Sequence, residues 1–140
     1  MPGRKPADML AFLACDGSSL EPASHKTNLF GLFDVIYIES FPSIFRPFSL
    51  FVKLANAPRR IRGEIRGYTP DGKQFGAAKI KMSASAKDAK AATGFILQVG
   101  PVPIPQPGIM HFDLEIDGVV IGWPCEIEVK DKVPKNLKIK

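Results

Sequence analysis

Histidine and cysteine are scarce in this chain, with two residues of each among 140. Cys15 and Cys125 lie far apart, so the sequence has no C-x-x-C spacing of the kind that marks a metal-ligand pair. A disulfide between them is geometrically open if the first and last strands meet, but a cytosolic protein is expected to keep both thiols reduced. The sequence also has no glycine-rich phosphate-cradling loop, and we expect no cofactor.

Long hydrophobic runs are absent as well. No stretch approaches the ~20 apolar residues of a membrane span. Arg4 and Lys5 precede the apolar residues 9–14, which end at Cys15 like a lipoprotein cleavage site. A signal core needs about 7–15 apolar residues, and this run is shorter and abuts Asp8. We interpret it as a buried first strand, and we expect a cytoplasmic protein with no membrane partner.

The net charge of +5 belongs to the ends of the chain, because residues 9–129 hold twelve basic and twelve acidic side chains. A chain of 140 residues has the size of one domain. We therefore predict a flexible basic leader at 1–8, a single domain at 9–129 and a Lys-rich tail at 130–140. Within the domain the charge is segregated, since residues 46–90 carry a surplus of +8.

Short β-prone stretches fill most of the domain. Outside the hairpins, we predict strands at 9–15, 27–39, 48–56 and 94–99. The first should break at Asp16 to Ser19, and Gly31 should form a bulge in the second. The proline-rich segments 41–47 and 101–107 read as connectors, because proline cannot continue a helix or donate to a sheet.

Two hairpins are marked most clearly. The first covers 60–82 and turns at Thr69 to Lys73, where Pro70 and Gly72 favour a tight turn. The second covers 109–129 and turns at Asp117-Gly118. On its return strand one parity is apolar and should face the core: Ile121, Trp123, Cys125, Ile127 and Val129. Residues 83–92 are small and polar, and they should form a loop or one helical turn.

Seven or eight short strands with turn signals and no convincing helix indicate an all-β fold. We predict an antiparallel β-sandwich of the immunoglobulin-like or Greek-key type.

The best candidate binding surface is the polar face of the first hairpin. Basic side chains beside an aromatic ring suit phosphate contact and base stacking. The candidate residues are Arg60, Arg62, Arg66, Tyr68, Lys79 and Lys81. Glu64 interrupts the row, and the alternative is a solvated or cross-paired face.

Two other chemistries have weaker support. His111 and Asp113 share a strand face and could be in contact, but no nucleophile motif accompanies them, so a small hydrolase around His111 is kept only as the third hypothesis. A row of acidic residues offers oxygen ligands, but no loop gathers them around a cation. These residues are Asp113, Glu115, Asp117, Glu126 and Glu128.

Three segments carry a resemblance to a known family. They are Ala14-Cys15-Asp16, then residues 28–36 with Ser40-Phe41-Pro42, and finally Pro107-Gly108 through Phe112, Asp117-Gly118 and Pro124. Together they resemble a family of small bacterial β-sandwich proteins that is catalogued only as a domain of unknown function. The resemblance implies a fold, and it implies no activity, cofactor or site.

The leading hypothesis is a non-enzymatic module that acts through protein contacts, including self-association, with Phe51 as an aromatic residue on a solvent-facing parity. The second hypothesis is an anion- or nucleic-acid-binding module that uses the 60–81 hairpin. Whether the basic hairpin pairs with the acidic 109–129 hairpin is left open by the sequence.

Overall fold

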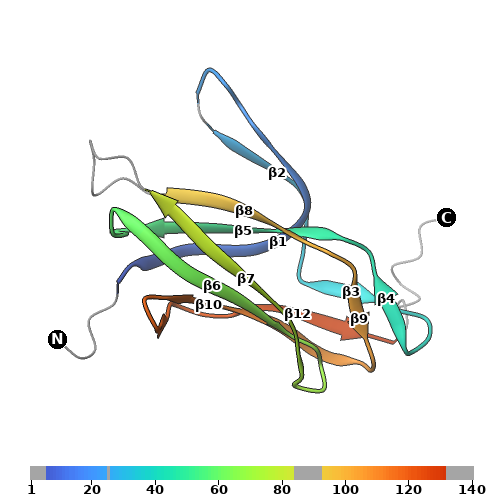
Figure 1. Ribbon diagram of the computed structural model, residues 1–140. Helices are drawn as coiled ribbons and strands as arrows, with labels where there is room; N and C mark the ends of the chain where they lie inside the picture. The colour runs from blue at the N-terminus through green and yellow to red at the C-terminus, as the bar shows by residue number, and fades with distance from the viewer. Residues whose placement is uncertain (1–5, 25, 84–92, 132–140) are drawn as a thin grey trace.

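The computed structural model describes residues 6–24, 26–83 and 93–131 (Figure 1). Every regular element in these ranges is a β-strand, so the prediction of an all-β fold is confirmed. The first sheet has four antiparallel strands. Their spatial order is β2 (Thr27–Phe33), β1 (Asp8–Leu20), β5 (Phe48–Ala55) and β8 (Thr93–Val99).

The second sheet contains six strands and is mixed. Its main path is β3 (Val35–Tyr37), β12 (Cys125–Lys130), β10 (Gly108–Ile116), β6 (Arg60–Tyr68) and β7 (Gln74–Ser83). The sixth strand, β11 (Val119–Val120), pairs with β10. β3 runs parallel to β12, whereas the other pairs are antiparallel. A separate two-stranded sheet joins β4 (Ser43–Phe45) to β9 (Val102–Ile104).

The inner faces of the two large sheets share one core. The rings of Phe48 on β5 and Phe112 on β10 meet edge to face, with centroids 5.9 Å apart. Along β5 the core-facing residues are those of the parity opposite to Phe51, and Phe48, Leu50, Val52 and Leu54 are all buried. On β10 the residues Met110, Phe112, Leu114 and Ile116 alternate inward in the same way.

The predicted count of seven or eight strands is wrong, because the described residues form twelve. Eight of these strands have six or more residues, and the other four have only two or three. Two of the short strands, β4 and β9, lie in the proline-rich segments that we expected to be plain connectors. Elements this short contain too few residues to show an alternation in sequence.

The predicted break at Asp16 to Ser19 is also wrong, since β1 continues to Leu20. Pairing with β2 holds these residues in a strand: Gly17 lies opposite Phe30, and Ser19 lies opposite Asn28. Gly31 has a positive φ of 64° and its backbone lies directly under the carboxylate of Asp16, but the predicted bulge is wrong, because the register of β1 with β2 is the same on both sides of Gly31. The β1–β2 hairpin projects from the rest of the molecule (Figure 1).

The predicted strand at 27–39 is two strands in different sheets. β2 pairs with β1, whereas β3 pairs with β12, so the chain crosses from one sheet to the other at Asp34. The carbonyl of Asp34 accepts a hydrogen bond of 2.8 Å from the Glu128 amide.

The second hairpin turns at Asp117-Gly118 as predicted, but its return strand is interrupted. The Ile121 amide still donates to the Leu114 carbonyl of β10, but Gly122 has a φ of 60° and Pro124 cannot donate a ladder hydrogen bond, so residues 122–124 leave the sheet. As a result Trp123 is 51% exposed, and its predicted place in the core is wrong. The turn of the first hairpin is confirmed, with the Gly72 amide bonded to the Thr69 carbonyl at 2.8 Å.

The predicted leader and tail lie largely outside the described residues, as does most of the loop predicted at 83–92. No helix in the described part of the chain is long and apolar enough to span a membrane.

Candidate functional site

The candidate basic surface occupies the outer face of β6 and β7. Arg62 lies directly opposite Lys81, and Glu64 lies directly opposite Lys79. The next strand in the sheet is β10, which sets Asp113 opposite Arg66 and Glu115 opposite Glu64. The basic and acidic hairpins are therefore neighbours in one sheet, a pairing that the sequence left open.

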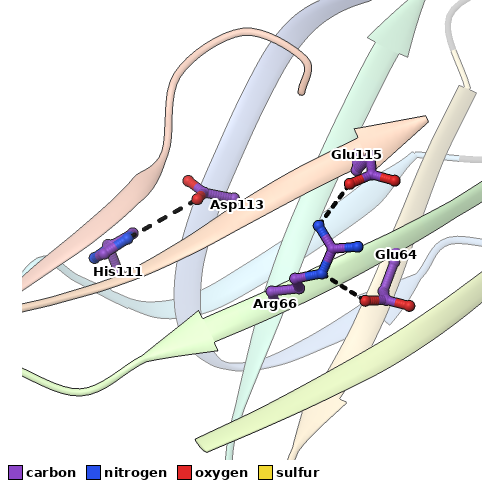
Figure 2. Close-up of polar contacts among 5 residues, drawn as sticks. All are labelled: Glu64, Arg66, His111, Asp113 and Glu115. Carbon is purple, nitrogen blue, oxygen red and sulfur yellow. Dashed lines mark hydrogen bonds and ion pairs between the residues drawn. The ribbon is translucent and has the colours of Figure 1, made fainter. Parts of the chain in front are cut away.

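Arg66 is part of an ion-pair network with two carboxylates (Figure 2). Its Nε lies 2.6 Å from a carboxylate oxygen of Glu64, and its Nη1 lies 2.5 Å from one of Glu115. The hydrogen bond to Glu115, followed by the charges of the two glutamates, raises the pKa of the guanidinium. Arg66 is thus neutralised within the protein, and it does not belong to a free cationic surface.

Tyr68 is also engaged within the sheet. It lies opposite His111, and the two rings stack with centroids 4.7 Å apart and planes inclined by 14°. The His111 Nε2 lies 3.9 Å from an Asp113 oxygen, so the expected histidine–carboxylate contact exists as a loose one (Figure 2). No hydrogen bond joins the imidazole to a serine or cysteine within residues 6–24, 26–83 and 93–131. The stack and the network together take two of the six predicted site residues.

The remaining four side chains stay together and exposed: Arg60, Arg62, Lys79 and Lys81. No ion pair in the described part of the chain involves any of them. Arg60, Arg62 and Lys81 line one hollow of about 350 Å³ at the open end of the hairpin.

A second surface, which the sequence indicated only through Phe51, covers the outer face of the first sheet. Leu13, Phe51 and Ile96 lie side by side on β1, β5 and β8. Leu32 and Phe30 extend the same face onto β2, where they are 57% and 55% exposed. We call these five residues the outer apolar patch. The pairing of β1 with β2 could not be read from the sequence, so the patch was missed as a unit.

Both cysteines are buried and free, so the disulfide that the sequence left open is not formed in this structure. Burial raises the pKa of the Cys125 thiol to about 12, and it also raises that of Cys15. Protonated, buried thiols are poor nucleophiles. Among the described residues, no group of three or more histidine, cysteine or acidic side chains could hold a metal ion.

An open groove of about 640 Å³ lies between β4, β9 and the turn of the first hairpin. Its walls include Ile44, Phe75 and Ile104. At its rim Asp71 accepts a hydrogen bond from the Thr69 hydroxyl, which lowers the pKa of the carboxyl group. No sequence motif marked this groove in advance.

Comparisons with known proteins give a family and a fold. A family model described as "Family of unknown function (DUF6941)" matches residues 10–130, as the resemblance predicted. No curated protein matches the sequence. One similar solved structure is the Pseudomonas fluorescens alkylpurine DNA glycosylase AlkC bound to DNA containing an abasic site analog, with a TM-score of 0.51 and 13% identity. The match covers 89% of this chain but only 30% of the glycosylase, and it concerns the fold alone.

Proposed function

The chain belongs to this family of unknown function, which lends it no activity, and we propose that it is a non-enzymatic module that associates with a second copy of itself through the outer apolar patch. The observation that carries the proposal is a row of apolar side chains that continues onto an exposed, uncharged edge strand. Contiguous apolar surface of this kind is typical of protein contacts.

The geometry of the patch suits a sheet-to-sheet contact. Leu13 is 40% exposed on β1, and Leu32 and Phe30 are more exposed on β2. Phe51 is held in place because its ring packs over Gly94, where a Cβ would lie 3.4 Å from the ring. Burying this face against an apolar partner would remove its surface from water, which is favourable at roughly 25 cal/mol per Å².

A second copy is the partner that the edge strand fits best. β2 contains no charged residue from Thr27 to Phe33, so two copies in antiparallel register set no like charges against each other. A twofold contact needs only one such self-complementary surface. In contrast, the edge strand β7 carries Lys79 and Lys81, and charged lysines protect an edge from pairing. β8, the other edge of the first sheet, and β7 line one pocket between the two sheets.

Light scattering over a range of protein and salt concentrations tests the proposal. A dimer that persists at high salt is expected, because apolar contacts are not screened. Phe30→Glu combined with Leu32→Glu should give a monomer. Ile44→Glu is the matched control, since Ile44 is 73% exposed on β4, away from the patch, and its replacement should leave the dimer intact. A wild-type chain that is monomeric at every concentration contradicts the proposal.

The two thiols support a proposal about the cellular compartment. With Cys15 and Cys125 both free, we propose that the protein works in a reducing compartment, the cytoplasm.

A further inference from the structure

The four cations of the first hairpin that form no ion pair among the described residues lie on a small grid. Arg60 and Arg62 alternate along β6, and Lys81 and Lys79 alternate along β7. The register sets Arg62 directly opposite Lys81. Residues that are directly opposite in an antiparallel pair have Cβ atoms about 4.5–5.5 Å apart, and like charges in that position are destabilising.

Three acidic residues lie next to this grid, and two of them are bonded to Arg66. Glu64 lies opposite Lys79, but its carboxylate is bonded to Arg66. Glu115 is bonded to the same guanidinium. Asp117 lies nearby in the turn after β10, where its amide donates to the Arg62 carbonyl, and it forms no ion pair with the grid. The Arg66 network carries a net charge of −1 and Asp117 adds another −1, so the four cations leave a local surplus of +2 on this face.

We propose that Arg60, Arg62, Lys79 and Lys81 form a binding site for the phosphates of a nucleic-acid backbone. Several cations on one exposed face can contact successive phosphates, and arginine forks bind phosphate oxygens in bidentate fashion. Neither β6 nor β7 has an exposed large apolar side chain that could insert into a lipid layer. Because Tyr68 stacks on His111 within the sheet, the contact is made to phosphates and is insensitive to base sequence.

The cross-strand pair supplies a variant that separates binding from folding. Lys81→Glu sets the introduced carboxylate opposite Arg62, which replaces a repulsion by an attraction. The variant should fold at least as stably as the wild type while it loses affinity for nucleic acid. If Lys81 serves only to protect an edge strand, Lys81→Glu should not lower the affinity for nucleic acid while the stability of the fold is kept or raised.

The test is a fluorescence-polarisation titration with a labelled single-stranded oligonucleotide and its duplex. Four phosphate contacts predict a slope of log K against log salt of about −3 for the single strand, and loss of one contact reduces it by about 1. Lys81→Glu, alone and with Arg62→Glu, should weaken binding by at least about tenfold at low salt. Lys73→Glu is the control of equal charge change, because Lys73 lies in the turn at the opposite end of the same hairpin.

Four outcomes would overturn the proposal. The first is no binding at low salt, and the second is equal weakening by Lys73→Glu. The third is competition by inorganic phosphate that is as complete as competition by unlabelled oligonucleotide at the same total phosphate concentration. The fourth is binding only to vesicles that contain anionic lipid. The substitutions on β6 and β7 do not alter the outer apolar patch. The nucleic-acid proposal can therefore fail in this test while the proposed self-association still holds.

Discussion

Glu64 and Glu115 lie directly opposite each other on β6 and β10, two carboxylates in a position where like charges repel. Arg66 reaches both of them, and this single guanidinium makes the juxtaposition stable. On the outer face of this strand pair, one ion-pair network links the acidic and basic hairpins, and its arginine has a structural role.

Removing that guanidinium should weaken the fold. Arg66→Gln leaves the two glutamates facing each other without a counter-ion, so we expect a lower midpoint in urea denaturation. Adding Glu115→Gln should restore most of the loss, because it removes the repulsion that Arg66→Gln exposes. Arg62→Gln is the control on the same strand, and it should leave the midpoint unchanged or raise it, since Arg62 faces Lys81. Equal destabilisation by both arginine variants would show that the network has no special role.

A pair of glycines opposite each other in the first hairpin should respond differently to alanine. Gly67 and Gly76 are register partners on β6 and β7. A Cβ on Gly67 would lie 2.5 Å from the Phe75 ring and 2.8 Å from that of Phe112, whereas a Cβ on Gly76 meets nothing within 4 Å. We expect Gly67→Ala to reduce the free energy of unfolding by about 1–3 kcal/mol.

Gly76→Ala should change that free energy by no more than about 1 kcal/mol, towards stability, because glycine weakens a strand interior. Urea denaturation of the two variants checks both values. If Gly67→Ala proves as harmless as Gly76→Ala, the close packing of the two phenylalanine rings around β6 is wrong.

The buried thiol of Cys125 should make stability fall at alkaline pH. Its pKa is raised from 9.0 to about 12 in the folded chain, so the protonated form is retained there while the unfolded chain ionises. The stabilisation is complete below pH 9.0 and is lost as the pH rises towards 12. Linkage predicts a loss of about 1.4 kcal/mol by pH 10 from this group.

Unfolding by urea at pH 7.5 and at pH 10 measures this loss, with Cys125→Ala as the reference. The variant should be less stable at both pH values because it creates a cavity, but its stability should fall less between them. Other groups titrate equally in both proteins, so the difference isolates the thiol. Parallel pH dependence in the two proteins would contradict the burial of Cys125.

The longer strands and both hairpin turns could be predicted because their signals are local. Alternation along β5 and β10 and the turns at 69–73 and 117–118 need no knowledge of partners. The crossing at Asp34 and the continuation of β1 beyond Asp16 could not be predicted, since each depends on which strand lies alongside. Trp123 was misplaced because Gly122 and Pro124 release residues 122–124 from the sheet, and the alternation of inward and outward side chains does not hold outside a sheet.

The same limit explains the candidate site. The sequence places Arg66 and Tyr68 on one face with Arg60 and Arg62, and that is correct. What decides their roles is β10, whose Glu115 comes 49 residues after Arg66 in the chain, and no local pattern identifies β10 as the neighbour of β6. The division of six candidates into two engaged and four free residues therefore needed the tertiary structure.

The position of β12 has a consequence for how the chain can acquire its fold during synthesis. This strand lies between β3 and β10, so it is an interior strand of its sheet although it is the last strand along the described chain. Its parallel partner β3 is separated from it by some ninety residues. A ribosome must therefore release almost the whole domain before that sheet can close, and contacts of such long range fold slowly. Until then the emerging chain has β10 and β3 as open edges, which is when binding by a chaperone would matter most.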